Sequence, residues 1–366
     1  MPVLAPTRES LAEKPMDSHK QDQKISVVDA MPLGLVLWLA GPYLAGQTPV
    51  QAIDLAHEIY GKHHFASTID ILGEESHTDE DCDRAVYAYR QLVDGIAAKP
   101  INVSGLFASR SQMTISIKPS MFTVVDVVGG ELESKNLDRG YERIEALVAY
   151  AKSKKINMTL EAEDHRWTDF HLDTYVSLIN KGYTNLGTVL QSRLFRTRED
   201  IKRFDERMRV RMVIGIYQEP SEIAQTQKPI MKSLLVEYCR ELLARGTYVE
   251  VATHDENCVD KFVKEAVLPV KAPATQFESQ FLLGVPRKEL ESNLISGQHF
   301  RKLLEENRTA LQDADKEHLE KLASSGELVR LYLPYGENKL SAAYCKRRLK
   351  ANPNMMLFGI KNLLRI

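Results

Sequence analysis

The sequence predicts an α/β fold in which eight parallel strands close into a distorted (β/α)₈ barrel. The main observation is a series of short strand-like runs that alternate with helix-length segments over most of the 366 residues. The runs cover residues 66–74, 113–120, 157–164, 185–192, 210–217, 248–255, 275–282 and 328–336. The main alternative, a doubly wound sheet, is disfavoured because no run is followed by GxGxxG or GxxxxGK[ST].

Polar residues occupy alternate positions of these strands. In run 113–120, Met113, Ile115 and Ile117 form the apolar set that faces the surrounding helices, so the intervening positions face the barrel interior. By this alternation, the inward side chains are Thr114, Ser116, Lys118, Thr159, Glu161, Glu163, Gln191, Arg211, Tyr217, His254, Glu278, Gln280 and Tyr332. Charges and amides are costly to bury without partners. Either they are solvated at strand ends, or they line a polar ligand site at the C-terminal face, which is the favoured interpretation.

The N-terminal part divides into a tail and a helical arm. The first 24 residues are polar, mixed in charge and rich in proline, which predicts a disordered tail rather than a signal peptide. Residues 25–46 are the most apolar stretch, but Asp29, Pro32 and Pro42 interrupt it. A buried or surface-lying helix is therefore favoured over a membrane span. With helices expected at 47–64 and 76–98, the predicted organisation is a tail at 1–24, an arm at 25–64 and a barrel domain at 65–366.

Net charge and cysteine spacing disfavour nucleic acid as a partner and disulfides or zinc as structural elements. The net charge of -2 provides no basic field for nucleic acid. The four cysteines are far apart and include no CxxC, which disfavours a disulfide framework or a zinc ribbon and fits a reducing compartment. The expected location is the cytoplasm, with peripheral attachment to the inner face of a membrane as the alternative.

A motif near the C-terminus places an aromatic residue and two arginines together. Tyr344, Arg347, Arg348 and Ala351 would share one face of a helix, just before the Asn-Pro pair at 352–353. A ring beside two guanidinium groups forms a fork suited to a carboxylate. An isolated arginine pair is usually solvated surface, but this one directly follows the eighth predicted strand and would lie over the barrel mouth.

The pattern YxxRRxxxNP resembles the substrate-binding helix of proline dehydrogenases. Further blocks resemble that family in the same order along the chain, and the likeness covers roughly residues 65–355. They are LGE (72–74), SIKPS (116–120), EAED (161–164), LQSR (190–193), RMVIGIYQEP (211–220), ATHD (252–255), FESQFLLG (277–284) and YLPYG (332–336). The ordered series, rather than any one block, makes the resemblance specific.

The resemblance implies a flavoenzyme that oxidises L-proline to 1-pyrroline-5-carboxylate. FAD is the implied cofactor, bound without a Rossmann fold, and it takes the hydride at N5. The implied partners are a membrane quinone as electron acceptor and a separate 1-pyrroline-5-carboxylate dehydrogenase. No metal is implied.

The resemblance also implies roles for individual residues. Lys118, Arg347 and Arg348 would hold the proline carboxylate, while Tyr332 and Tyr344 line the pocket beside the ring. Glu161 belongs to the same catalytic set, and Glu74 would act as a gate by pairing with Arg347. The implied flavin contacts are Gln191, Arg211, Gly215, Tyr217, Thr253, His254 and Glu278.

Three positions depart from the family pattern. Glu161 stands where an aspartate is usual, Ile214 where a lysine is usual, and Ala351 where the clamp helix normally has a glutamate. The first changes the geometry around Lys118, the second removes a charged contact to the cofactor, and the third removes a brace for the arginines.

Three other functions remain open at this point. A divalent-metal hydrolase or isomerase would use Glu161, Glu163, His165, His254 and Asp255, although an arginine clamp does not suit such a site. The departures at Ile214 and Ala351 would fit a barrel that binds ligands without catalysis. Hydroxyproline is an alternative substrate, but a tyrosine at 332 favours proline.

Overall fold

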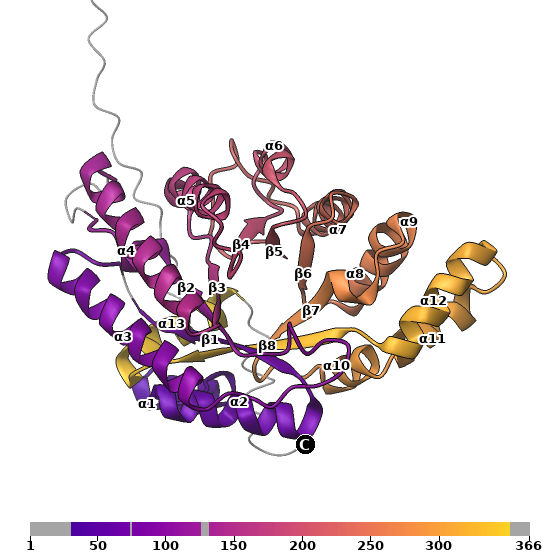
Figure 1. Cartoon of the computed structure of the whole chain (residues 1–366), viewed down its shortest axis with the longest axis horizontal. Coiled ribbons are helices and arrows are strands. Elements are labelled where there is room, and N and C mark those ends of the chain that lie inside the picture. Colours follow the sequence, from indigo (N-terminus) through magenta and orange to yellow (C-terminus); the bar gives the residue numbers. More distant parts are fainter. Residues whose placement is uncertain (1–30, 74, 126–131, 352–366) are drawn as a thin grey trace, which may run out of the picture.

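The computed structural model describes residues 31–73, 75–125 and 132–351, and in it the eight strands form a closed parallel barrel. Each strand pairs in parallel with the next, and the last pairs back with the first (Figure 1). The strands are β1 (Ala66–Ile71), β2 (Thr114–Ile117), β3 (Asn157–Leu160), β4 (Leu186–Gln191), β5 (Arg209–Val213), β6 (Tyr248–Ala252), β7 (Phe277–Leu282) and β8 (Leu328–Tyr335). The predicted barrel is confirmed.

Helices connect the strands and surround the barrel (Figure 1). They are α1 (Leu33–Ala40), α2 (Pro49–His63), α3 (Asp79–Ala98), α4 (Ser134–Ser153), α5 (Thr168–Asn180), α6 (Thr197–Asp200), α7 (Lys228–Ala244), α8 (Glu256–Lys261), α9 (Leu268–Val270), α10 (Lys288–Ile295), α11 (Gln298–Asn307), α12 (Asp313–Ser325) and α13 (Asn338–Ala351). The helices expected at 47–64 and 76–98 are α2 and α3. Each begins with a capping box, formed by Thr48 with Gln51 and by Thr78 with Asp81.

Several strands end earlier than the sequence runs predicted. Pro119 begins a short 3₁₀ turn (Pro119–Met121) directly after Lys118, so β2 stops at Ile117. Strand β5 ends at Val213, and two residues later Gly215, with a φ of +103°, turns the chain away from the strand direction. Tyr217 therefore lies in a loop, 37% exposed. Its predicted inward orientation is wrong because the alternation of a strand no longer applies beyond Val213.

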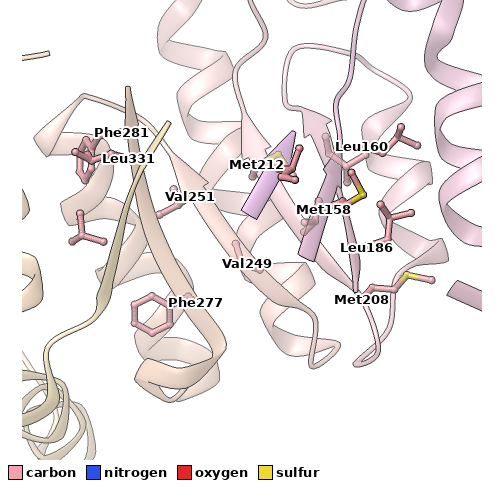
Figure 2. Packing of buried hydrophobic residues seen from close by; sticks show 14 of the residues in the cluster. Met158, Leu160, Leu186, Met208, Met212, Val249, Val251, Phe277, Phe281 and Leu331 are labelled. Atoms are coloured by element: carbon pink, nitrogen blue, oxygen red, sulfur yellow. The ribbon is translucent and has the colours of Figure 1, made fainter. Parts of the chain in front are cut away.

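The main hydrophobic core lies between the barrel and its helices. Met158 and Leu160 on β3, and Val249 and Val251 on β6, occupy alternate positions and are fully buried within one cluster (Figure 2). Burying such side chains stabilises the fold by about 1.5–3 kcal/mol each. The side chains that point outward from the strands thus pack against the helices. The side chains that point into the barrel are free to be of other types.

The lower half of the barrel interior contains paired charges, in a group that we call the lower layer (Arg209, Tyr248, Glu250, Glu278 and Arg330). Arg209 contacts the Glu250 carboxylate. Arg330 Nε donates to Glu278 Oε1 at 2.6 Å, and the Tyr248 hydroxyl donates to Glu278 Oε2 at 2.9 Å. All five side chains are buried. Charges in such a place are tolerated because each has a partner of opposite sign and further hydrogen bonds.

The N-terminal arm packs against the C-terminal helix. Helix α1 lies beside α13 (Figure 1), and Val36 of α1 shares a buried cluster with Tyr344 and Leu349 of α13. Its other face leaves Trp38 52% exposed, so α1 is a surface helix with one buried side. Within the described ranges, no helix has the length and apolarity that crossing a bilayer requires. The predicted tail at 1–24 lies outside the described residues.

Candidate active site

A largely buried cluster of polar side chains occupies the C-terminal mouth of the barrel. Arg211 on β5 donates from Nη1 to Glu161 Oε1 at 2.5 Å and from Nε to Gln280 Oε1 at 2.6 Å. Its guanidinium carbon lies 5.1 Å from the ring centre of Tyr332 on β8. The Tyr332 hydroxyl is 3.4 Å from Glu161 Oε1, and Ser116 donates to the same oxygen. Contacts between strands that are not neighbours confirm that these side chains point inward, as the alternation predicted.

Electrostatics favour the charged form of Arg211 and the neutral form of the Tyr332 hydroxyl. Burial disfavours the charge on Arg211, but the carboxylates of Glu161 and Glu250 outweigh that effect and raise its pKa above the ordinary value. Burial also raises the pKa of the Tyr332 hydroxyl. The mouth therefore presents a permanent guanidinium cation and a neutral phenol at physiological pH.

Lys118 has a partner, Asp70, that the strand alternation alone did not single out. Its ammonium contacts the carboxylate of Asp70 on β1 and donates to the carbonyl oxygen of Ile71 at 3.1 Å. Asp70 is 1% exposed. The alternation of residues in run 66–74 indicates that Asp70 points into the barrel, because its neighbour Ile69 points outward. Its importance was not visible without knowing that Lys118 lies directly beside it.

Glu163 forms hydrogen bonds that link its own segment to Ser120 after β2 and to Gln191 at the end of β4. Its carboxylate accepts hydrogen bonds from the Ser120 amide at 2.9 Å and the Ser120 hydroxyl at 2.6 Å. Its carbonyl oxygen accepts from Gln191 Nε2 at 2.9 Å. Burial raises the pKa of Glu163 to about 7, despite these hydrogen bonds. The chain segments that follow β2 and β3 and the C-terminal end of β4 are thus fixed relative to one another.

Helix α13 brings part of the predicted clamp to the mouth. The guanidinium carbon of Arg348 lies 5.2 Å from the ring centre of Tyr344, a buried residue. Burial lowers the pKa of His254 to about 4, and the positive charges of Arg348 and Arg287 contribute to this lowering. Glu74 and the side chain of Arg347 lie outside the described residues. The structure therefore describes one of the two predicted clamp arginines.

The predicted flavin contacts fall into separate places. Gln191 and Gly215 meet at the mouth, where a β-carbon on Gly215 would overlap Gln191 Oε1. Thr253 follows β6, and its hydroxyl accepts from the Asp255 amide at 3.2 Å. Glu278 belongs to the lower layer, where Arg330 and Tyr248 are its partners. The sequence alternation placed Glu278 on the correct face of its strand without showing its depth.

Among the buried polar atoms that lack a hydrogen-bond partner in the described residues, three lie on residues predicted to contact the flavin. They are Gln191 Oε1, Arg211 Nη2 and His254 Nδ1. They come from β4, β5 and the segment after β6, which are consecutive around the barrel. Buried polar groups normally have partners, so an acceptor, a donor and an imidazole nitrogen without partners fit a ligand that supplies complementary polar atoms. The residues present are therefore compatible with a flavin.

Two of the five side chains named for a metal site, His165 and Asp255, are engaged elsewhere. His165 Nδ1 lies 2.6 Å from Glu219 Oε2, and Asp255 pairs with Lys232. In the part of the chain that the structure describes, no group of three histidine, cysteine or acidic side chains is arranged to hold a metal ion.

Together, the fold and this cluster define a (β/α)₈-barrel protein with a polar ligand site at the C-terminal ends of its strands. The chain belongs to the proline dehydrogenase family, whose model matches residues 55–358. It is 28% identical over 332 residues to the proline dehydrogenase of Deinococcus radiodurans, covering 90% of this chain and 91% of that protein. It is 24% identical to proline dehydrogenase 1 of Bacillus subtilis (strain 168), covering 88% and 90%.

Solved structures with the same fold include the proline utilization A (PutA) protein of Bdellovibrio bacteriovorus. The TM-score is 0.66 at 18% identity, over 85% of this chain and 32% of that one. A PutA mutant of Bradyrhizobium japonicum gives a TM-score of 0.59 at 20% identity, over 85% and 30%. The chain thus spans about a third of the length of these PutA proteins. At this identity the likeness shows the fold.

Proposed function

We propose that this chain oxidises L-proline to 1-pyrroline-5-carboxylate with FAD as cofactor. The observation that carries the proposal is the mouth cluster of Arg211, Glu161 and Tyr332, flanked by Lys118 and Arg348, in a member of the proline dehydrogenase family. Electrons would pass to a membrane quinone, and a separate 1-pyrroline-5-carboxylate dehydrogenase would take the product. The proposed location is the cytoplasm or the inner face of a membrane.

The substrate carboxylate is assigned to the cations at the mouth. Lys118 and Arg348 supply charge-assisted donors, and Arg347 is assigned with them from its place in α13. Tyr332 and Tyr344 would flank the pyrrolidine ring, since Tyr332 lies beside Arg211 and Tyr344 lies beside Arg348. A small substrate held at one end by its carboxylate has its ring carbons fixed in position, which is the main requirement for hydride removal.

The cofactor is assigned to the side of the mouth that carries the three unpartnered atoms. Gln191, Arg211 and His254 would supply its polar contacts, Thr253 would add a hydroxyl, and Gly215 would allow the backbone to approach closely. When bound, FAD supplies the hydride acceptor at N5. The guanidinium of Arg211 stabilises negative charge that develops nearby. Tyr217 and Glu278 are assigned from the resemblance alone, and the proposal does not depend on them.

The protein also affects the protonation of the substrate amine. Only the neutral amine can release a hydride from the neighbouring carbon. Cations that face the amine lower its pKa and so favour the neutral form. His254 adds no positive charge at neutral pH, because its pKa is lowered to about 4 by burial and by the nearby arginines.

Two departures from the family pattern have a physical explanation in this chain. The longer side chain of Glu161 still reaches Arg211 at 2.5 Å. Ile214 packs against the main hydrophobic core, so an apolar contact takes the place of a charged one. Neither change disrupts the mouth cluster.

The test is an absorbance spectrum of the purified protein before and after proline is added without oxygen. We expect flavin bands that bleach on addition of proline and not on addition of a chelator. A protein without flavin bands would contradict the proposal. Flavin bands that proline does not bleach would instead favour the non-catalytic binding protein, and faster bleaching by hydroxyproline would reassign the substrate.

A further inference from the structure

Asp70 and Lys118 lie side by side because of strand register and parity. Asp70 on β1 pairs with Ser116 on β2, and Lys118 follows two residues later on the same inner face. The longer lysine side chain can therefore fold back onto the aspartate. Asp70 is 1% exposed, whereas the Lys118 side chain is 20% exposed. The aspartate is thus covered by protein, and the lysine remains accessible from the mouth.

The ammonium group of Lys118 uses some of its N–H donors within the protein and has one left for a ligand. An ammonium group has three N–H donors. Two of them have acceptors on β1 in the described residues, namely the Asp70 carboxylate and the Ile71 carbonyl oxygen. One N–H is left for a ligand, and the first two determine its direction.

We propose that Asp70 is a positioning residue that holds the Lys118 ammonium in place for the proline carboxylate. This inference rests on the proposed function, since it requires Lys118 to bind that carboxylate. A lysine side chain has four rotatable bonds and loses much conformational freedom when it is ordered. Ordering by Asp70 takes place before the substrate arrives, so the binding step does not have to include it.

Two effects of Asp70 on substrate binding oppose each other. Its negative charge reduces the attraction of the site for a carboxylate, whereas its contact orders the donor. The ordering effect is the larger one under this proposal, because the aspartate is buried behind the lysine and its contact is a directional, charge-assisted hydrogen bond. The two effects predict opposite changes when the charge is removed.

The experiment compares Asp70→Asn and Asp70→Ser with the wild type, using the flavin-loaded full-length chain. We expect the KM for proline to rise about tenfold in Asp70→Asn and further in Asp70→Ser, with a smaller change in kcat. The inhibition constant of cyclopentanecarboxylate, a ring carboxylate without the amine, should rise in parallel. A KM that falls or stays constant in both variants would overturn the proposal.

Thr68→Val is the matched control. Thr68 lies two residues before Asp70 on the same strand, and its hydroxyl bonds to that of Thr114 on β2 at 2.8 Å. The substitution removes a buried polar contact between the same two strands, one layer below Lys118. We expect a lower melting temperature and an unchanged KM for proline. If Thr68→Val raises the KM as much as Asp70→Asn does, general loosening of the strands explains both results and the proposal fails.

A double-mutant cycle separates this inference from the proposed function. Lys118→Ala alone should raise the KM for proline, and adding Asp70→Asn to it should cause no further rise. If Lys118→Ala leaves the KM unchanged, the assignment of Lys118 in the proposed function is wrong. If Lys118→Ala raises the KM and Asp70→Asn raises it by the same factor in both backgrounds, Asp70 acts independently of Lys118 and only this inference is overturned.

Discussion

The two ends of the barrel interior carry similar residues but satisfy them differently. In the lower layer, Arg330 donates to Glu278 and also to the carbonyl oxygens of Ser67 at 3.2 Å and Arg110 at 2.5 Å. None of the five lower-layer side chains has a buried polar atom without a partner among the described residues. At the mouth, Arg211 and Gln191 are equally buried, yet each retains one such atom.

This difference separates structural charges from those available to a ligand. Burial and charge alone do not distinguish Arg330 from Arg211, since both are arginines paired with a glutamate. The distinction lies in whether the protein itself completes their hydrogen bonds. Substitutions at the lower layer should therefore change the free energy of unfolding, and those at the mouth should change ligand binding.

The largest effect is expected in the lower layer, from Arg330→Met. It leaves the Glu278 carboxylate buried without its cation, which should lower the free energy of unfolding by about 3–5 kcal/mol. Urea unfolding measures this loss. The KM for proline of the protein that remains folded should not change. A changed KM would show that the hydrogen bond from Gln280 Nε2 to Glu278 Oε1, at 2.6 Å, transmits the loss to the mouth, and it would break the comparison.

Arg348→Met is the corresponding test at the mouth. Losing a charge-assisted contact to the substrate should weaken proline binding by about 2–4 kcal/mol. The flavin should remain bound, because the three unpartnered atoms lie on other residues. Steady-state kinetics and the flavin spectrum provide the two measurements. An unchanged KM would remove Arg348 from the clamp.

Tyr332→Ser should have a smaller effect on binding and should alter specificity. Loss of the ring next to Arg211 should raise the KM for proline. The expected loss of binding free energy from the missing apolar contact is about 1–3 kcal/mol. The space and the new hydroxyl should also narrow the preference for proline over hydroxyproline. The ratio of kcat/KM for the two substrates measures this preference. A constant ratio would mean that Tyr332 does not lie at the edge of the substrate.

Glu327, directly before β8, should make the free energy of unfolding depend on pH without affecting the mouth. Burial raises its pKa to about 8 against the opposing effect of the Ser279 hydroxyl. The folded state therefore retains a proton that the unfolded state releases at lower pH, so stability falls as pH rises towards 8. The expected loss is about 1 kcal/mol between about pH 7 and pH 8.5. Glu327→Gln should remove this contribution to the slope without changing the KM for proline, and an unchanged slope in urea unfolding would contradict it.

Much of the mouth was predictable because strand alternation is a local property. The inward orientation of Glu161, Arg211, Gln280 and Tyr332 follows from apolar residues at every second position, and the structure confirms it. The same rule failed at Tyr217, because the strand had already ended at Val213. Local patterns thus indicate a face, and they apply only as far as the strand extends.

The sequence by itself determined the closed barrel, its family and the inward set of polar residues, since periodicity and ordered motifs are written along the chain. Only the tertiary structure decided which of these residues meet. The depth of Glu278 in the lower layer and the pairing of Asp70 with Lys118 both depend on the register between strands that lie apart in sequence. Alternation has a period of two and carries no information about register across the barrel, so partners and depth emerge only when the strands close.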